Sequence, residues 1–222
     1  VRIQGGRLDF EVCANDERVA GSLIGLLVID GVVVREVMLG PHLSAQLCGP
    51  GDLLELGSAR DQRCLPALAT ISVPGTAVLA LLDDRVLAAS RRWPRLAGRL
   101  LVQAMRQIGD ADAHQTISQL PRVEDRLLAL FWHLADRWGR VLPDGVRIEL
   151  PLTHEMIGRL IGARRPTVTL GLRALRDARL LQRQTEGAWL LAHDSWQRLT
   201  RADAERSRGH RSTLPSSADL SR

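Results

Sequence analysis

The sequence lacks the features that would assign it to a membrane-spanning, disulfide-stabilised or zinc-binding class. No apolar run among its 222 residues reaches the roughly 18 residues that a membrane-spanning helix needs. Its three cysteines, Cys13, Cys48 and Cys64, are odd in number, widely spaced and without a C-x-x-C pair, which opposes a disulfide framework or a zinc site. No signal peptide is recognisable, although the chain starts at Val1 rather than Met. We expect a soluble, cytoplasmic protein that does not bind a membrane.

The motifs of common enzyme classes are also missing. There is no G-x-S-x-G, P-loop or G-x-G-x-x-G pattern. A metal-dependent enzyme built on a β-roll needs several histidines and a carboxylate around one metal. The strand-rich first part of the chain contains only His42 and no H-x-H pair. We predict that the chain is not an enzyme, and we identify no metal site and no cofactor; haem ligation by His42 or a cysteine stays open as an alternative.

Lysine is absent, so all 30 basic side chains are arginines. Residues 1–120 contain 12 arginines and 13 acidic residues, whereas residues 121–222 contain 18 arginines and 12 acidic residues. The first part is therefore close to neutral and the second is strongly basic. A basic region of this kind predicts contact with a polyanion such as nucleic acid. A basic surface without a partner is the alternative.

Short apolar segments separated by turn residues occupy the first part of the chain. The turns are predicted at Asp30-Gly31, Gly40-Pro41-His42, Gly49-Pro50-Gly51-Asp52 and Pro74-Gly75. The strands between them are predicted at 23–29, 32–39, 43–48, 69–73 and 77–82. Strands at such regular spacing indicate a small barrel or roll.

Helical periodicity follows the strands. A short helix is predicted at 83–90, and Pro94 opens a longer one that extends towards Gln119. The long helix has an apolar stripe made of Ala97, Leu100, Leu101, Ala104, Met105, Ile108 and Ala111. A further helix over 123–138 has an apolar face that should form the core of a second domain. A turn at 143–145 and a strand at 146–150 come next.

The stretch from Leu152 to Leu181 has the pattern of two helices joined by a tight turn. Thr153 is suited to cap the first helix, and Gly162 is suited to end it. The second helix opens at Arg164-Arg165-Pro166-Thr167, with an inner stripe of Val168, Leu172 and Leu175. A short helix, a turn and a second helix with a basic first turn indicate a DNA-reading helix-turn-helix. Two amphipathic helices of an ordinary bundle are the alternative. A strand, a Gly turn and a strand over 181–191 then predict a wing.

This stretch resembles the helix-turn-helix of the CRP/FNR (cyclic-AMP receptor protein/FNR) family of bacterial transcription regulators. The matching residues are Leu152-Thr153-His154-Glu155, Ile157-Gly158, Ile161-Gly162, Arg165, Thr167-Val168, Leu172, Leu175 and Leu180-Leu181. The resemblance implies an α+β protein with a cyclic-nucleotide-binding-like β-roll, a long dimerisation helix and a C-terminal winged helix-turn-helix. The implied boundaries are 1–92 for the roll, 93–120 for the dimerisation helix, 121–195 for the DNA-binding domain and 196–222 for a disordered tail. A long helix packed on its own roll is the alternative to a dimer helix.

The resemblance also implies roles for individual DNA-binding residues. Arg165 matches the family's base-reading arginine, and a guanidinium can pair with guanine O6 and N7; Arg164 and Thr169 are adjacent candidates. The candidate phosphate contacts are Thr153, His154, Thr167, Arg173 and Arg183. For His154, a solvent-exposed residue of the first helical turn without a DNA contact is the alternative. Pro166 and Leu170 stand where well-known members carry a glutamate and a second arginine. We therefore expect a different operator half-site, with fewer direct base contacts.

The ligand-binding residues of the family are not retained. Members that bind cyclic AMP use a Gly-Glu turn for the ribose and an Arg-Ser pair for the phosphate. Glu55 resembles the first element only in part, and Ala67-Leu68 stand at the position of the second. Arg60 and Arg63 lie nearby in the sequence and complete the candidate effector-binding residues. The implied effector is not cyclic AMP; the roll binds another effector, binds none, or has become structural. Iron–sulfur members need four cysteines, and this chain has three.

The sequence thus predicts a sequence-specific transcription regulator that binds double-stranded DNA as a homodimer. RNA polymerase is the further partner that the resemblance implies, and control by a ligand in the β-roll is the implied regulation. A protein–protein adaptor, or a ligand-independent architectural DNA binder with the same winged helix, is the alternative.

Overall fold

The computed structural model of the chain describes residues 2–8, 23–55, 68–184 and 186–198. It divides into two compact units. The first contains the described residues of 1–118 together with 155–162, and the second contains those of 119–154 and 163–222. Within the described residues, no helix combines the length and the apolar character that a membrane crossing requires.

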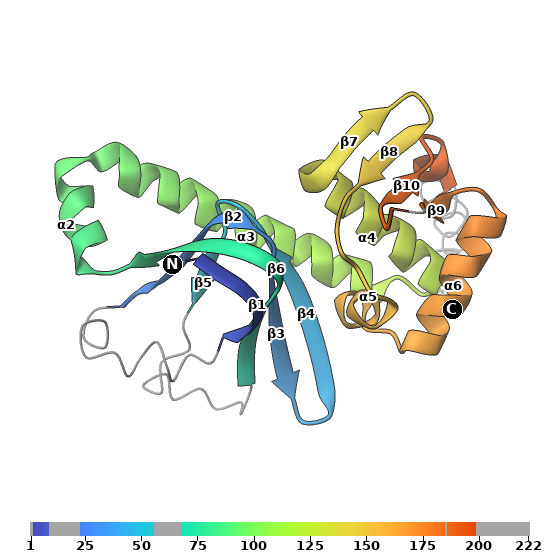
Figure 1. Ribbon diagram of the computed structural model, residues 1–222, viewed down its shortest axis with the longest axis horizontal. Helices are drawn as coiled ribbons and strands as arrows, with labels where there is room; N and C mark the ends of the chain where they lie inside the picture. The colour runs from blue at the N-terminus through green and yellow to red at the C-terminus, as the bar shows by residue number, and fades with distance from the viewer. Residues whose placement is uncertain (1, 9–22, 56–67, 185, 199–222) are drawn as a thin grey trace, which may run out of the picture. The chain divides into compact units, whose positions relative to one another are not determined.

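The first unit is built on an antiparallel sheet (Figure 1). Its strands are β1 (Arg2–Leu8), β2 (Gly25–Gly31), β3 (Val33–Leu39), β4 (His42–Cys48), β5 (Leu53–Glu55) and β6 (Leu68–Leu82). The strand order is β4-β3-β6-β2-β5, and β1 also pairs with β6. The long strand β6 joins the sheet together because it pairs with β1, β2 and β3. Side chains from β2 to β6 form one buried core.

The prediction of a turn at Pro74-Gly75 was wrong, because β6 continues through both residues. The pairing register of β1 against β6 shifts between Gln4 and Gly6, opposite Pro74-Gly75. Both residues are exposed. A proline has no N–H for a regular ladder, but it is tolerated where a strand bulges. The pair therefore interrupts the ladder without reversing the chain.

Asp30-Gly31 also differs from its predicted role as a turn, because both residues belong to β2 and pair with β6. Strands β2 and β3 lie on opposite sides of β6 and do not pair with each other. Gly31 has a φ of 87°, and a Cβ there would lie 2.2 Å from the carbonyl oxygen of Thr76. Only glycine fits this close approach, so the residue marks a backbone contact. The turn predicted at Gly40-Pro41 does connect β3 to β4.

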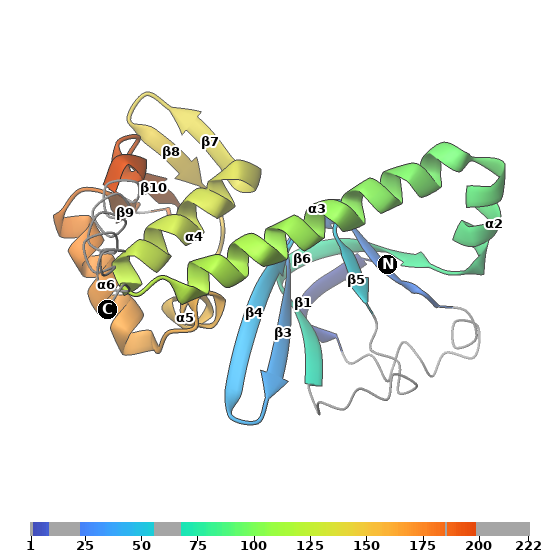
Figure 2. The same cartoon turned by 180° about the vertical axis from the view of Figure 1, so that it is seen from behind.

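The long helix α3 (Pro94–Gln119) follows a short helix α2 (Asp84–Arg92) and passes along the roll (Figure 2). Polar side chains attach α3 to the segment that leads into β5. The Gln107 side chain accepts a hydrogen bond from Leu53 N at 2.8 Å and donates one to Leu53 O at 2.9 Å. Gln103 donates to the buried carboxylate of Asp52 at 3.3 Å. That carboxylate also accepts from Gly49 N at 2.8 Å, which fixes the Gly49–Asp52 turn.

The predicted apolar stripe of α3 divides between two environments. Leu100 and Ala104 are half-buried. Leu101, Met105 and Ile108 of the stripe, together with Val102, are between 55% and 65% exposed. Packing on the roll therefore accounts for part of the stripe only.

The second unit combines helix α4 (Val123–Trp138) with the sheet order β7-β8-β10-β9. Its strands are β7 (Gly139–Leu142), β8 (Gly145–Ile148), β9 (Leu181–Arg183) and β10 (Trp189–Leu191). Strand β7 had no prediction from the sequence. Phe131 of α4 packs on Trp189 of β10 with ring centroids 4.9 Å apart. Trp189 is buried and therefore belongs to the core beneath the wing.

The predicted start of a disordered tail at residue 196 falls inside a folded segment. Residues 195–198 are helical. Ser195 is buried and accepts a hydrogen bond from Trp132 Nε1 at 3.1 Å. Trp196 packs edge-on against Trp132, with centroids 5.9 Å apart. The folded part therefore extends at least to Arg198, and the rest of the predicted tail, 199–222, lies outside the described residues.

Candidate nucleic-acid interface

The two helices of the predicted motif form where the sequence placed them. Helix α5 (His154–Ile161) begins directly after Thr153. Gly162 follows with a φ of 65°, the left-handed conformation that commonly ends a helix. Helix α6 (Arg165–Asp177) begins after the extended residue Arg164, with Pro166 in its first turn. The sequence signals for the start of both helices and for the end of α5 therefore agree with the backbone.

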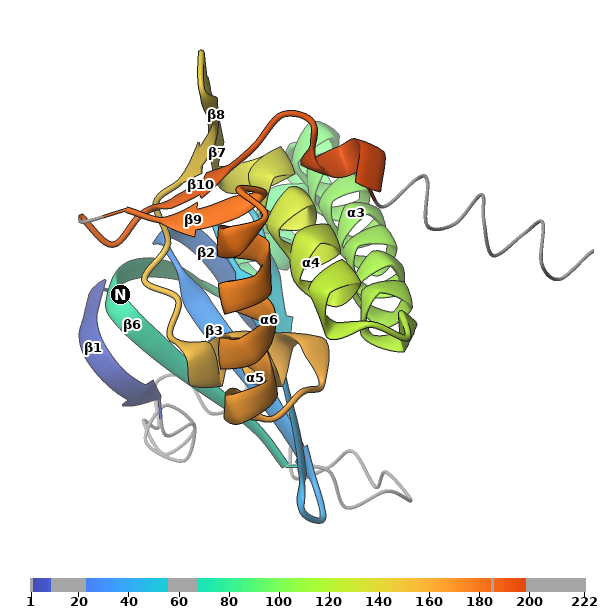
Figure 3. The same ribbon diagram turned by 90° about the vertical axis from the view of Figure 1, so that its right-hand side faces the viewer.

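Helix α6 packs against α4 through its apolar stripe (Figure 3). Val168, Gly171, Leu172 and Leu175 are buried. A Cβ on Gly171 would lie 2.8 Å from Leu127 Cδ1 and 3.2 Å from Val123 Cγ1. This close approach holds α6 with its opposite face in solvent. The exposed residues on that face include Arg165, Pro166, Thr169, Leu170 and Arg173.

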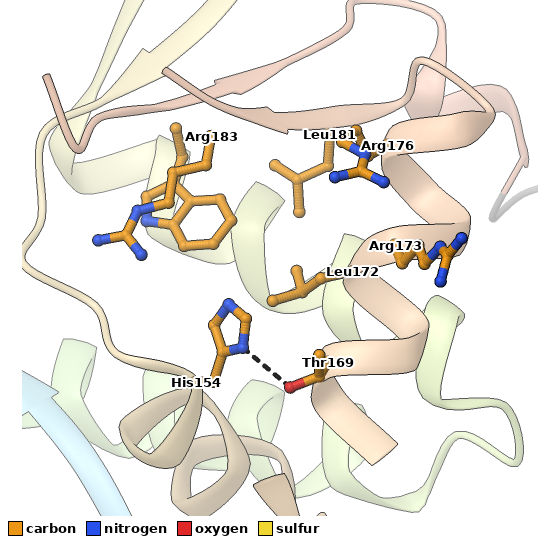
Figure 4. Close-up of a pocket in the computed structure, with 8 residues that line it drawn as sticks. His154, Thr169, Leu172, Arg173, Arg176, Leu181 and Arg183 are labelled. Carbon is orange, nitrogen blue, oxygen red and sulfur yellow. Dashed lines mark hydrogen bonds between the residues drawn. The ribbon is translucent and has the colours of Figure 1, made fainter. Parts of the chain in front are cut away.

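A hollow of about 420 Å³ lies beside α6 (Figure 4). We call it the α6–β9 hollow; it is lined by His154, Thr169, Leu172, Arg173, Arg176, Leu181, Arg183 and Trp189. Leu172, Leu181 and Trp189 are buried and make its apolar part. The other five residues are polar, and none of the eight is acidic. An apolar floor with cationic and hydroxyl groups around it suits a sugar–phosphate chain.

Two arginines of the hollow also have an acidic neighbour. Arg176 Nη2 lies 3.3 Å from Asp177 Oδ1, and Arg173 Nε lies 3.9 Å from Asp177 Oδ2. All three side chains are well exposed, so these ion pairs are weak and screened by salt. Both guanidinium groups remain able to exchange this carboxylate for a phosphate.

Arg183 reaches the hollow from the wing. It pairs directly with Trp189 in the β9–β10 ladder. Its guanidinium carbon lies 5.4 Å from the centroid of the Trp189 ring, a cation–π distance. The stacking orients an exposed cation on a rigid strand. Strand β10 also pairs with β8, so the wing is part of the larger sheet of this unit.

His154 is joined to α6 by a hydrogen bond between side chains. His154 Nδ1 lies 2.9 Å from Thr169 Oγ1 (Figure 4). Thr169 Oγ1 in turn donates to the carbonyl oxygen of Arg165 at 3.0 Å. Burial of the imidazole lowers the pKa of His154 below its ordinary value, and the positive charges of Arg183 and Arg165 lower it further. The ring is therefore mostly neutral at pH 7.

The structure brings together four of the eight predicted DNA-binding residues, namely His154, Thr169, Arg173 and Arg183. Thr153, Arg164, Arg165 and Thr167 do not line the hollow but are exposed around the starts of α5 and α6. Arg176 was not among the predicted site residues. Its place three residues after Arg173, on the same helical face, was the signal that could have identified it.

Of the predicted effector-binding residues, only Glu55 lies within the described part of the chain. Glu55 is exposed at the end of β5. Arg60, Arg63 and Ala67 lie outside the described residues. Within the described part of the chain, no group of three or more His, Cys, Asp or Glu side chains is placed to hold a metal ion.

Comparison with known proteins places this site in a family. The sequence model of the Crp-like helix-turn-helix domain matches residues 125–202. The regulatory protein CysR of Synechococcus elongatus is 31% identical over 149 residues, which are 65% of this chain and 64% of CysR. The chain thus matches slightly less than two thirds of the length of this curated relative.

Two solved structures share the fold. The transcriptional regulator TTHB099, of the CRP family, from Thermus thermophilus is 19% identical with a TM-score of 0.62, over 93% of this chain and 96% of that one. FixK2 from Bradyrhizobium japonicum is 17% identical with a TM-score of 0.62, over 90% and 91%. Residues 125–202, which contain most of the site described above, thus match the Crp-like helix-turn-helix domain, and the chain as a whole shares its fold with a CRP-family transcriptional regulator.

Proposed function

We propose that the protein is a sequence-specific, DNA-binding transcription regulator and that α6 is its reading helix. The observation that carries this proposal is the α6–β9 hollow beside the exposed face of α6. Guanidinium, hydroxyl and imidazole groups from α5, α6 and β9 gather there without an acidic residue in the lining. Such groups hold backbone phosphates, while the exposed first turns of α6 are free to meet base edges in the major groove.

Arg165 is the proposed base reader, and Arg173, Arg176 and Arg183 are proposed phosphate contacts. Arg164, Thr153 and Thr167 are exposed around the same helix starts and complete the proposed interface. Replacing Arg165 with Ala should relax the choice of base at one position of each half-site. Replacing Arg176 with Ala should weaken binding to every duplex by a similar factor. Affinities measured on the operator and on single-base variants test this, and equal, sequence-independent losses in both variants would remove Arg165 as a base reader.

Leu170 is proposed to read a thymine methyl group. Its side chain is 67% exposed on α6, and Pro166 lies one turn earlier on the same helix. An apolar side chain on a reading helix can contact the C5-methyl of thymine but cannot pair with guanine. The half-site should therefore differ from that of members with two polar readers at these positions.

The homodimer is proposed from the exposed apolar stripe of α3. Side chains such as Leu101, Met105 and Ile108 recur at spacings of four and three residues, the spacing of a helix–helix seam. A second copy of α3 would cover this stripe. Two subunits would then present α6 to successive major-groove faces about 34 Å apart on a pseudo-palindromic operator.

The roll is proposed to respond to an effector other than cyclic AMP, or to none. The cationic residue that a buried phosphate needs is missing at Ala67-Leu68. Calorimetric titration with cyclic AMP, cyclic GMP and cyclic di-GMP tests this, and micromolar binding of cyclic AMP would refute it. RNA polymerase is the further proposed partner, since a regulator bound at a promoter acts on transcription by recruiting or excluding it.

In-vitro selection of duplexes bound by the full chain, with and without cell-extract metabolites, is the most informative experiment. We expect one enriched pseudo-palindrome and a steep salt dependence, because each neutralised phosphate contributes a slope of about −0.9 in log K against log salt. Enrichment of no sequence with a steep salt dependence would favour an architectural binder. Absence of duplex binding at low salt would favour a protein–protein adaptor.

A further inference from the structure

The hydrogen bonds around Thr169 determine which nitrogen of His154 carries a proton. A threonine hydroxyl has a single hydrogen, and Thr169 donates it to the carbonyl oxygen of Arg165. The same hydroxyl oxygen must therefore accept from His154, so Nδ1 is the protonated nitrogen. In the neutral ring the second nitrogen, Nε2, then carries a lone pair and no hydrogen.

The second nitrogen of His154 faces the α6–β9 hollow. Figure 4 shows the Nδ1 side of the ring directed at Thr169 and the opposite side directed into the space between Leu172 and Arg183. The positive groups around this space are Arg173 and Arg176 from α6 and Arg183 from β9. Arg165 adds its positive charge from the first turn of α6. On its own helix, the nearest acid is Glu155, which is paired with Arg159.

We propose that His154 is a proton-linked DNA contact, which is neutral in the free protein and takes up one proton from solvent when a backbone phosphate enters the hollow. This inference rests on the proposed function. A phosphodiester oxygen offers only lone pairs, so a neutral Nε2 would face it as one acceptor facing another. Protonation converts Nε2 into a donor and adds a positive charge beside the phosphate.

The direction of the pH dependence follows from the two states. In the free protein, burial and the surrounding arginines lower the pKa of His154. In the complex, the negative phosphate partly neutralises these arginines and hydrogen-bonds to the charged ring, which raises the pKa. Between the two pKa values, DNA binding takes up a proton, and affinity increases as pH falls. Above both values the affinity reaches a low plateau, and below both it reaches a high plateau.

Anisotropy titrations of the full chain with its selected operator, at constant salt from pH 6 to pH 8.5, test the proposal. One proton per subunit gives at most a tenfold gain in affinity per subunit for each unit of pH decrease, or about 100-fold for a dimer. His154→Gln should abolish this slope and retain the weak plateau affinity. His154→Arg should bind independently of pH. The matched control is His193→Gln, because His193 contacts Leu142 O at 3.0 Å outside the hollow and should leave the slope unchanged.

Two results would overturn the proposal: a wild-type affinity independent of pH, or an unchanged slope in His154→Gln. In either case the operator is still bound, so the proposed function stands. If no duplex is bound at any pH, the proposed function itself fails. Imidazole titration followed by NMR in the wild-type protein requires no variant. It should show a higher pKa for His154 with operator than without, and an equal pKa in both states would also reject the proposal.

Discussion

Helices α3 and α4 have similar apolar periodicity but opposite surroundings. In α4, 16 residues include six that are buried, five of them apolar. In α3, 26 residues include one that is buried, Ile117. The apolar face of α4 packs against α6 and β8 of its own unit. Most of the apolar face of α3 is in solvent, so the same sequence pattern produces a domain core in one helix and an uncovered seam in the other.

The two helices differ in the side chains that they present to the sheet of their own unit. Towards the roll, α3 presents Gln103 and Gln107, which hydrogen-bond to Asp52 and Leu53. The large apolar side chains of Leu101, Met105 and Ile108 stay exposed on another face. A helix attached through polar groups keeps its apolar stripe available, which is the arrangement that a second subunit requires.

The largest effect should come from placing charges in the α3 seam. We expect the double substitution Leu101→Asp, Met105→Asp to convert the proposed homodimer into a folded monomer. Each side chain contributes about 1.5–3 kcal/mol when fully buried. Because twofold symmetry repeats both changes, the dimer dissociation constant should rise by about 10,000-fold or more. Sedimentation velocity over a range of protein concentrations measures this.

The control for the seam is Val141→Asp on β7, which places the same charge at a strongly exposed apolar residue of the other unit. It should leave the dimer intact. If the double variant remains a dimer at nanomolar concentration, the α3 stripe is not the dimer interface.

A smaller but still large loss of stability should follow from creating a cavity in the core beneath α4. Phe131 is fully buried and packs on Trp189, so Phe131→Ala should lower the free energy of unfolding by roughly 3–5 kcal/mol. Ile108→Ala, an exposed site of α3, should change it by less than about 0.5 kcal/mol in the monomeric double variant. Each substitution is introduced into the monomeric double variant, and urea unfolding measures the free energy that each one removes. Equal losses would mean that the two helices do not differ in the way described.

The polar attachment of α3 should contribute less than the α4 core. Gln107→Ala removes both hydrogen bonds to Leu53, so the first unit should lose about 1–3 kcal/mol of unfolding free energy. Gln115→Ala, an exposed glutamine of the same helix, is the matched control and should have no measurable effect. Urea unfolding of the monomeric variant is again the measurement. Because alanine has a higher helix propensity than glutamine, helix propensity cannot cause a loss in either variant. A loss in Gln115→Ala as large as that in Gln107→Ala would show that the loss does not come from the two hydrogen bonds to Leu53.

Local signals predicted most of the helix-turn-helix. Gly162 and Pro166 mark the end of α5 and the start of α6, since each depends only on the backbone conformation of neighbouring residues. The stripe of Val168, Leu172 and Leu175 predicted the buried face of α6 because a helix repeats at short range. The exposed candidates Arg165, Thr169 and Arg173 followed from the opposite face.

Features that depend on distant pairing were not predictable in this way. Asp30-Gly31 and Pro74-Gly75 have turn composition, but partner strands keep both pairs within the sheet. The hollow combines His154, Arg176 and Arg183 from three elements. No spacing rule relates these residues, since their proximity is created by the packing of α6 and the wing. Likewise, periodicity revealed the stripe of α3 but not which part of it the roll would cover.

The smallest expected effect concerns Leu170. We expect its exposed apolar side chain to be covered by DNA, whereas the exposed side chains of α3 are expected to be covered by protein. Replacing thymine by deoxyuridine, one position at a time in the selected half-site, removes single methyl groups. At the position read by Leu170 the affinity should fall by about fourfold per methyl, the equivalent of about 0.8 kcal/mol. Leu170→Ala should bind the thymine and deoxyuridine duplexes equally at that position, whereas Val141→Ala, an exposed apolar site on β7, should keep the wild-type preference.

A methyl preference that persists in Leu170→Ala would assign the thymine contact to another residue. If no thymine in the half-site responds, the apolar face of α6 does not read methyl groups, and exposure of a side chain on the reading helix would not by itself identify a base contact.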